Sequence, residues 1–309
     1  MYRIAIVTTD IKRDWASQRL LAAIRTRASG DTVDPISFGM KIQGKLDIRS
    51  KGISAGTYDA FIVRAFNRQG EIDYQYEIFQ IMEQQGKLVI NSMAGLSMAE
   101  SKAQTSYCLG LAGLPVPRTI VTQDIKEALD ALKRFGQAVT KPLYGSFGVG
   151  IEKVDHKNGE ELLRNSLNKD GLIYLQEYIP NQGRDIRAFV VGDKIPAAMY
   201  RIAHKGQWKT NVFQGSSCQP CRLSPALKEL CMEAVRVVGL EYTGIDIIEG
   251  PNGPVILELN GAPAWHGLES TINRDISEDI IEHVIHMLKT GRPARQPAKL
   301  PLKEPARDR

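Results

Sequence analysis

Residues 243–260 read TGIDIIEGPNGPVILELN and predict a β-hairpin with acidic residues inside apolar strands. Pro-Asn-Gly at 251–253 separates two apolar runs, and a three-residue loop that ends in glycine is common in hairpins. With that loop, Asp246 lies opposite Glu258, and Asn260 lies on the same face because side chains alternate along a strand. The segment therefore predicts two facing carboxylates and an amide on one face of a sheet.

These three side chains predict a metal site. Two facing carboxylates repel one another and are costly in an apolar strand pair without a cation. Three oxygen donors suit Mg²⁺, which proteins often share with the phosphates of a substrate. The alternative is an exposed sheet face on which the acids are merely solvated. The neighbouring Ile, Leu and Val residues indicate burial, so the pattern favours Asp246, Glu258 and Asn260 as metal ligands.

A glycine-rich segment, KPLYGSFGVG at 141–150, lies between two predicted strands. It lacks the Lys-Ser/Thr pair of a Walker loop, and a strand rather than a helix follows it. The backbone N–H groups of such a hairpin can hold a polyphosphate, and a lysine at its start adds positive charge. Taken alone, the glycines also suit a flexible hairpin tip. The candidates for phosphate binding are Lys141, Gly145, Ser146, Gly148 and Gly150.

Polar residues alternate with apolar ones in the strand-rich region 173–211. Any one of them can be an ordinary solvated side chain. As a set beside a phosphate loop and a metal site, they indicate a cleft for a nucleotide and an acidic substrate. The set consists of Glu177, Asp185, Arg187, Arg201, Lys209 and Asn211.

The order of apolar runs predicts an α/β domain followed by a mixed α+β region. We expect the α/β domain at 1–95, a linker helix with a central subdomain at 96–180, a C-terminal subdomain at 181–290 and a tail at 291–309. The expected strands are Ile4–Val7, Phe61–Val63, Leu88–Ile90, Thr119–Val121, Ala138–Lys141, Ile173–Ile179, Ile186–Val191, Ile195–Tyr200, Thr243–Glu249 and Pro254–Leu259. The expected helices span 15–27, 72–85, 96–112, 125–134, 159–167, 225–238 and 277–289.

The formal net charge of +5 comes largely from the tail. Residues 291–309 carry six Lys or Arg against two acids, so the body of the chain is nearly neutral and gives no indication of nucleic acid. Prolines recur every fourth residue from Pro293 to Pro305, which forbids a helix. We therefore expect an extended, solvated and disordered tail. The alternative is a weak contact with an anionic partner.

Composition places the chain among ordinary globular proteins, with 43% hydrophobic and 24% charged residues. No apolar run approaches the roughly 18 residues of a membrane span. Four cysteines in 309 residues do not make a disulfide framework, and we expect a cytoplasmic location.

Taken in order, the motifs resemble those of the ATP-grasp ligases, most closely the RimK-like α-L-glutamate ligases. The resemblance runs from about residue 60 to 290. The motifs are Lys102, KP at 141–142 with GSFGVG at 145–150, QEYI at 176–179, GRDIR at 183–187, WKTN at 208–211, GID at 244–246 and ELNGAP at 258–263.

The resemblance implies a pre-ATP-grasp α/β domain followed by two ATP-grasp subdomains with ATP between them. It implies that Lys102 and Lys141 contact the phosphates and that Arg187 and Arg201 face the reacting carboxylate and the glutamate. Asp246, Glu258 and Asn260 match the ligands of Mg²⁺, for which Mn²⁺ can substitute. Further ATP contacts are implied for Glu177, Tyr178, Asp185, Lys209, Thr210 and Asn211.

Two segments depart from the ribosomal-protein-modifying members. Position 209 is Lys where the resemblance leads us to expect Arg, so bidentate contact with phosphate is weaker there. The loop 262–267 reads APAWHG, and this version looks more like ligases that glutamylate pterin or deazaflavin coenzymes, notably tetrahydromethanopterin. Trp265, with His266 beside it, would contact the acceptor by stacking on a flat ring. The alternative is that Trp265 packs under the loop.

The implied reaction is ATP-dependent amide formation. ATP phosphorylates a carboxylate to an acyl phosphate, which the amine of glutamate attacks, so no enzyme nucleophile is needed. The expected partners are glutamate and a small carboxylate acceptor, with no nucleic acid and no membrane, and a homo-oligomer is left open. The alternatives are a ligase acting on a protein C-terminus such as that of a ribosomal protein, a kinase that stops at phosphoryl transfer, and a non-catalytic ATP-binding partner of a larger complex.

Overall fold

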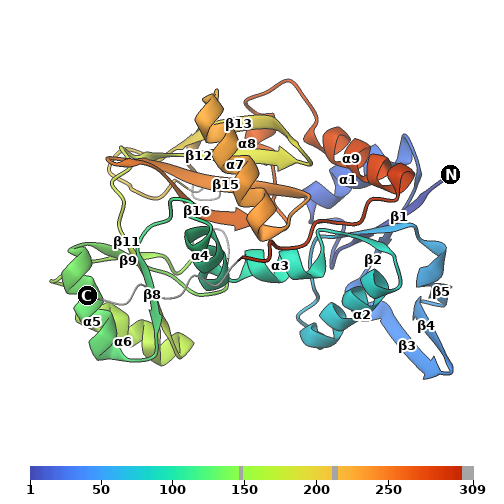
Figure 1. The fold of residues 1–309 in the computed structure, drawn as a ribbon, viewed down its shortest axis with the longest axis horizontal. Coiled ribbons are helices and arrows are strands. Elements are labelled where there is room, and N and C mark those ends of the chain that lie inside the picture. Colours follow the sequence, from blue (N-terminus) through green and yellow to red (C-terminus); the bar gives the residue numbers. More distant parts are fainter. Residues whose placement is uncertain (146–148, 211–214, 301–309) are drawn as a thin grey trace.

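The computed structural model describes residues 1–145, 149–210 and 215–300. They form an N-terminal domain, a central subdomain and a C-terminal subdomain (Figure 1). Within these residues, no helix combines the length and the apolar character that crossing a membrane requires.

The N-terminal domain is built on a parallel sheet with the strand order β2-β1-β6-β7. Alternate residues of its first strand enter two different cores. Ile4 and Ile6 pack with α1 and with the last helix, α9 (Ile276–Thr290), on one face, whereas Ala5 and Val7 pack with α2 on the other. Both faces are covered, so the strand is an apolar run, as expected for a parallel sheet. The elements are β1 (Arg3–Val7), α1 (Trp15–Arg25), β2 (Ser29–Val33), β6 (Ala60–Val63), α2 (Ile72–Gln84) and β7 (Leu88–Ile90).

A second, small antiparallel sheet in this domain was not anticipated from the sequence. The signal was present in the sequence, because Phe38, Met40 and Ile42 stand at alternate positions, as do Leu46 and Ile48. The hairpin projects from the domain (Figure 1). The elements are the 3₁₀ turns η1 (Pro35–Ser37) and η2 (Ala55–Thr57) with β3 (Phe38–Gln43), β4 (Lys45–Ser50) and β5 (Ile53–Ser54).

The expected single helix at 96–112 is two helices, α3 (Met93–Glu100) and α4 (Lys102–Leu111). Ser101 between them has an extended backbone, and its side chain accepts a hydrogen bond from Gln104 N at 3.3 Å. A serine at this position stabilises the start of a new helix. The break makes Lys102 the first residue of α4.

The central subdomain is an antiparallel sheet with the strand order β10-β9-β11-β8, covered by two helices. Its elements are β8 (Thr119–Thr122), α5 (Ile125–Phe135), β9 (Ala138–Thr140), β10 (Glu152–Val154), α6 (Gly159–Asp170) and β11 (Ile173–Glu177).

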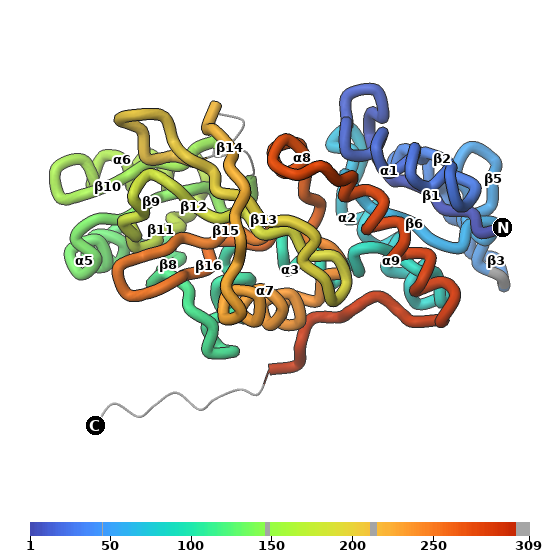
Figure 2. Tube along the Cα trace, turned by 90° about the horizontal axis from the view of Figure 1, so that it is seen from above, coloured from blue at the N-terminus to red at the C-terminus, as the bar shows by residue number. Residues whose placement is uncertain are grey.

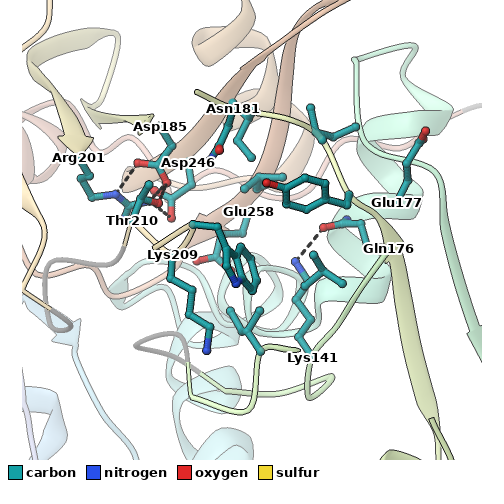
Figure 3. Close-up of a pocket in the computed structure, with 17 residues that line it drawn as sticks. Lys141, Gln176, Glu177, Asn181, Asp185, Arg201, Lys209, Thr210, Asp246 and Glu258 are labelled. Atoms are coloured by element: carbon teal, nitrogen blue, oxygen red, sulfur yellow. Dashed lines mark hydrogen bonds and ion pairs between the residues drawn. The ribbon is translucent and has the colours of Figure 1, made fainter. Parts of the chain in front are cut away.

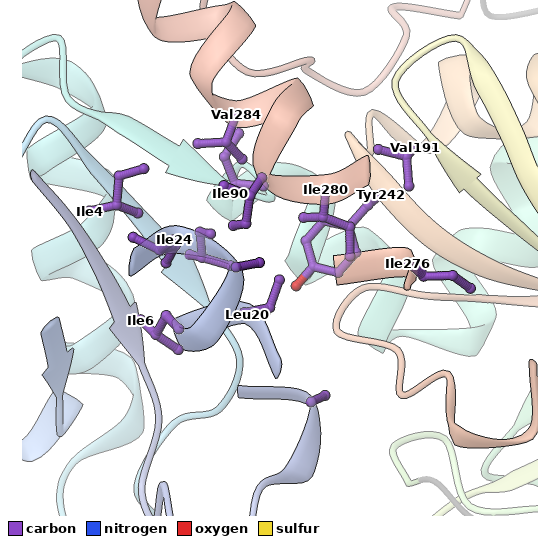
Figure 4. Close-up of a cluster of buried hydrophobic side chains, with 14 of the residues drawn as sticks. Ile4, Ile6, Leu20, Ile24, Ile90, Val191, Tyr242, Ile276, Ile280 and Val284 are labelled. Carbon is purple, nitrogen blue, oxygen red and sulfur yellow. The ribbon is translucent and has the colours of Figure 1, made fainter. Parts of the chain in front are cut away.

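The C-terminal subdomain is an antiparallel sheet with the strand order β14-β13-β12-β15-β16. Helix α7 covers one face, whereas the last helix, α9, packs on α1 of the N-terminal domain, so its residues share a core with the first strand (Figure 4). The elements are β12 (Arg184–Val191), β13 (Lys194–Ile202), β14 (Ser217–Pro220), α7 (Pro225–Val238), β15 (Tyr242–Gly250), β16 (Gly253–Asn260), α8 (His266–Glu269) and α9 (Ile276–Thr290).

The hairpin of β15 and β16 has the predicted pairing at its acidic residues, but its loop length and its register differ from the prediction. Gly250 pairs with Gly253, so the loop has two residues rather than the expected three. The register then shifts between Asp246 and Ile247, and beyond this shift Asp246 pairs with Glu258. One extra residue in a strand is a β-bulge. Here the bulge compensates for the shorter loop.

The prediction of a solvated tail is wrong for residues 291–300, which we call the strap. The strap is extended, but it lies along the C-terminal subdomain (Figure 2). Ser92 Oγ donates to Arg295 O at 2.6 Å, and Ala298 N donates to Val237 O at 3.0 Å. Proline forbids a helix but leaves an extended backbone free to pair with neighbouring segments. Residues 301–309 lie outside the described residues.

Candidate functional site

A cleft lies between the sheets of the central and C-terminal subdomains (Figure 3). It encloses about 730 Å³ of empty space, a figure that includes space open to solvent. Many of the predicted residues line it, namely Lys141, Glu177, Tyr178, Asp185, Arg201, Lys209, Thr210, Asp246 and Glu258.

Lys141 follows β9 and is buried at one side of the cleft. Its Nζ donates to Gln176 Oε1 at 3.0 Å, and Gln176 in turn donates to Thr119 Oγ1 at 3.1 Å and Tyr174 OH at 3.2 Å. Burial lowers the pKa of Lys141 to about 8, against the opposing charge of Glu258. The lysine therefore lies in a site that lacks a close anion and would gain one from a phosphate.

Lys102 stands near Lys141 although 39 residues separate them in the sequence. Its Nζ donates to Gly145 O at 2.8 Å, at the start of the glycine-rich segment. Burial lowers the pKa of Lys102, and Glu258 opposes the shift. Gly145 and Gly150 are exposed at the edges of this segment. Ser146 and Gly148 lie outside the described residues, so their role in phosphate binding stays a prediction.

A network of buried ion pairs occupies the other side of the cleft. Arg201 binds Asp185 through two hydrogen bonds of 2.7 and 2.6 Å, and it also approaches Asp246 Oδ2 at 2.9 Å. Arg187 Nη2 donates to the same Asp246 oxygen at 3.0 Å, and Thr210 Oγ1 donates to Asp185 at 2.6 Å. Burial alone would raise the pKa of Asp246, but Arg187 and Arg201 outweigh it and lower this pKa. Asp246 is therefore a carboxylate at neutral pH.

The residues of this side fit Mg²⁺ in their donor chemistry. Glu258 lies directly across the strand pair from Asp246, and Asn260 Nδ2 donates to Gly244 O at 3.1 Å, which leaves its side-chain oxygen as a donor to a metal. Asp246 Oδ1 is buried and forms an ion pair with Arg187 Nε, but it accepts no well-directed hydrogen bond among the described residues. Those residues contain no group of three or more His, Cys, Asp or Glu at metal distance, so phosphate oxygens would complete such a site.

Glu177 contributes to the cleft differently from the other acids. Its carboxylate binds Arg118 through two hydrogen bonds of 2.8 Å and points away from the labelled lysines (Figure 3). The Arg118 hydrogen bonds lower the pKa of Glu177. Tyr178 packs edge-on against Trp208, and Lys209 lies beside them in the cleft wall. Asn211 lies outside the described residues.

Three polar or aromatic cleft residues were absent from the predicted contacts, namely Gln176, Asn181 and Trp208. Gln176 and Trp208 each precede predicted contacts directly in the sequence, so their place in the QEYI and WKTN motifs was the available signal. The hydrogen bond from Lys141 to Gln176 joins two strands and is not encoded in either motif alone.

Trp265 is not accessible to an acceptor, so the prediction that it stacks on a flat ring of the acceptor is wrong. The side chain is 1% exposed, packs between Trp15 and Phe189, and donates from Nε1 to Glu269 at 3.0 Å. The alternative of packing under the loop is confirmed. Its neighbour His266 is exposed and lies over Trp15 with ring centroids 3.7 Å apart. The loop thus points one aromatic residue into the core and the next toward solvent.

Comparison with known proteins shows which family the chain resembles in sequence. A family model described as the RimK-like ATP-grasp domain matches residues 99–284. The tetrahydromethanopterin:α-L-glutamate ligase of Methanosarcina acetivorans is 34% identical, covering 87% of this chain and 94% of the relative. The corresponding ligase of Methanococcus maripaludis is 30% identical over 93% and 99%, and a probable α-L-glutamate ligase of Vibrio vulnificus is 31% identical over 89% and 92%.

Solved structures share the fold at lower identity. The ATP-grasp ligase PsnB in complex with a minimal precursor superposes with a TM-score of 0.74 at 21% identity, covering 93% of this chain and 99% of that chain. A RimK domain ATP-grasp protein of Sphaerobacter thermophilus superposes with a TM-score of 0.67 at 19% identity, covering 92% and 99%. A further PsnB structure contains Mg and ADP.

Proposed function

This chain belongs to the RimK-like ATP-grasp family, and we propose that it adds L-glutamate to the carboxylate of a small pterin coenzyme similar to tetrahydromethanopterin. The chain is an ATP-grasp ligase that forms amide bonds, and such ligases use ATP and Mg²⁺. The acceptor is supported by one observation. The relatives named as tetrahydromethanopterin ligases match nearly the whole of this chain, including its N-terminal domain.

For phosphoryl transfer to a carboxylate, the site offers two lysines on one side and, on the other, two arginines that are paired with Asp185 and Asp246. In the proposed roles, Lys102 and Lys141 bind the phosphates of ATP, while Arg187 and Arg201 hold the acceptor carboxylate and stabilise negative charge as it moves. The carboxylate oxygen attacks the γ-phosphorus and ADP leaves, which gives an acyl phosphate. The amine of glutamate then attacks the acyl carbon, loses a proton, and phosphate leaves.

Asp246, Glu258 and Asn260 would hold Mg²⁺, or Mn²⁺ in its place. When bound, such an ion neutralises charge on the phosphate oxygens. Burial of the surrounding residues excludes water, which protects an acyl phosphate from hydrolysis. Glu177 contributes through its backbone in this proposal, because its carboxylate is already paired with Arg118.

A second candidate acceptor is a peptide or protein carboxylate. It is favoured by the fold neighbours whose structures contain precursor peptides.

The experiment that separates these acceptors uses isotope-labelled glutamate with ATP and Mg²⁺. We expect the label to appear as an amide on the pterin, with one ADP and one phosphate formed for each bond. Label on a peptide, and none on the pterin, would replace the small-molecule acceptor with the second candidate.

The metal assignment has its own test in Asp246→Asn and Glu258→Gln. Each removes a negative ligand while keeping the size of the side chain, so we expect at least a hundredfold loss of amide formation, in the range seen when a charge-stabilising group is removed. Unchanged turnover in both variants would refute the metal site. Glu249→Gln is the matched control, because Glu249 lies on the same strand but pairs with Arg184 at the surface.

A further inference from the structure

Three backbone carbonyl oxygens at the end of β16 and in the loop after it accept hydrogen bonds from side chains. Thr243 Oγ1 donates to Asn260 O at 2.9 Å, Asn91 Nδ2 donates to Gly261 O at 2.7 Å, and Arg64 Nη1 donates to Pro263 O at 2.8 Å. Asn91 and Arg64 belong to the N-terminal domain, outside the cleft. Two of the three donors therefore come from a domain that does not line the nucleotide site.

Asn91 uses its whole hydrogen-bonding capacity on this contact. It follows β7 directly and is fully buried. Its Nδ2 donates to Tyr242 O at 2.9 Å as well as to Gly261 O, and its Oδ1 accepts from Glu241 N at 2.6 Å and Tyr242 N at 3.1 Å. A side-chain amide offers two donor hydrogens and two acceptor lone pairs. One side chain therefore joins the start of β15 to the residue after β16.

Arg64 follows β6 and places a buried charge against the same loop. Its side chain is 5% exposed, and its guanidinium lies 3.4 Å from Tyr242 OH and 5.9 Å from the centre of the Trp265 ring. The nearest acid, Asp14, is 3.9 Å away and already caps α1. Burying a guanidinium with so distant a counter-ion is costly. The hydrogen bond to Pro263 O is therefore an important polar contact of this buried group.

The backbone of this loop is closely packed between these donors. A Cβ added at Gly261 would lie 2.8 Å from Leu96 Cδ2 and 3.4 Å from Ala99 Cβ, so the backbone lies directly on α3. Asn260 is fixed on its other side by its own hydrogen bond to Gly244 O. Movement of Gly261 therefore displaces Asn260 and, through the paired strands, Glu258.

We propose that Asn91 and Arg64 are positioning residues that set the geometry of the metal-binding carboxylates from the N-terminal domain. The proposal rests on the assignment of Asp246, Glu258 and Asn260 as metal ligands. Neither residue touches the cleft, and both act through the backbone of residues 260–263. Residues that orient metal ligands affect metal affinity about 10- to 100-fold when changed.

The test measures Mn²⁺ binding directly, by electron paramagnetic resonance titration in the presence of ADP. Asn91→Asp keeps the size of the side chain and its acceptor oxygen but removes both donor hydrogens. Arg64→Lys keeps the charge but shortens the reach to Pro263 O. We expect both variants to raise the dissociation constant of Mn²⁺ about tenfold, with a smaller effect on ADP binding without metal.

The control variant is Ile78→Ala, which opens a cavity in the N-terminal core on the α2 face of the sheet. It lowers the melting temperature without touching residues 260–263, and we expect wild-type Mn²⁺ affinity. If Asn91→Asp and Arg64→Lys lose stability but keep wild-type Mn²⁺ affinity, the two residues are only structural and the proposal is wrong. If Asn91→Asp does not fold, Arg64→Lys alone decides.

The same titration separates this inference from the proposed function. Asp246→Asn and Glu258→Gln should abolish Mn²⁺ binding. If these two variants retain it, the metal assignment itself is wrong. If they abolish it while the Asn91 and Arg64 variants bind normally, only the positioning role is refuted.

Discussion

Lys141 and Arg201 are buried cations on opposite sides of one cleft, and their neighbours shift their pKa values in opposite directions. Burial lowers the pKa of Lys141, whose closest partner is the neutral amide of Gln176. Burial also disfavours the charge of Arg201, but Asp246 and Asp185 outweigh it and raise its pKa. Arg201 is therefore charged at every accessible pH, whereas Lys141 titrates near neutrality.

The lysine gives a prediction for nucleotide binding. Lys141 is protonated below pH about 8, so ADP affinity should be constant from about pH 7 to 8 and fall above that, by up to about tenfold per pH unit. Lys141→Arg stays protonated throughout and should remove this fall. Isothermal titration calorimetry between about pH 7 and 9.5 gives the ADP affinity of both proteins. If the affinity of both falls with pH in the same way, the assignment of Lys141 to phosphate binding is wrong.

Helices α6 and α7 end in the same way but meet different surroundings. Each ends at a glycine with a left-handed backbone, Gly171 with φ of +72° and Gly239 with φ of +78°. A Cβ at Gly171 would meet nothing within 4 Å, whereas at Gly239 it would lie 2.3 Å from Pro297 N of the strap. The local sequence of a helix end thus shows that glycine is favoured there. It does not show how much stability the protein would lose if the glycine were replaced.

This pair predicts a difference in stability. Gly171→Ala should lower the free energy of unfolding by about 1 kcal/mol, the cost of a left-handed alanine. Gly239→Ala carries the same strain plus a clash with the backbone of the strap, and should cost about 1–3 kcal/mol more. Urea unfolding of both variants measures the difference. Equal losses would mean that the strap does not press on the end of α7.

Helix α9 and the strap are joined to the rest of the C-terminal subdomain around one buried carboxylate, Glu241. His283 of α9 contacts it at 2.7 Å, and the Arg295 N–H of the strap donates to it at 2.8 Å. Arg295 also binds Asp193 at 2.6 Å. Burial would raise the pKa of Glu241, but the hydrogen bonds from His283 and Arg295 outweigh it and hold this pKa below its ordinary value.

The lowered pKa determines how Glu241 affects stability with pH. A depressed folded-state pKa stabilises the protein above the ordinary value of 4.5, and this contribution is lost as the pH falls below it. Glu241→Gln should therefore lower the free energy of unfolding by about 3 kcal/mol at pH 7 and flatten its decline below about pH 4.5. Urea titrations across this range test it. Glu249→Gln, which loses only an exposed pair, should change stability by less than about 1 kcal/mol.

The sequence alone determined most of the helices and strands and many of the residues that line the cleft. Helix 225–238 and strand Leu88–Ile90 have the predicted bounds, because apolar periodicity and flanking Ser, Pro and Gly are local signals. The pairing of Asp246 with Glu258 was also predicted correctly, although the loop and the bulge that produce it were not. A bulge depends on how a whole sheet twists and packs, and no short segment encodes it.

Only the tertiary structure decided which polar and aromatic groups meet. Trp265 is buried rather than open to an acceptor, and the strap is docked rather than solvated. Asn91 and Arg64 reach the loop after Asp246 and Glu258 from more than 150 residues away in the sequence. Side-chain burial and hydrogen bonding of this kind depend on the packing of distant segments. Residue type and spacing determine only the local secondary structure and the chemical groups that each segment carries.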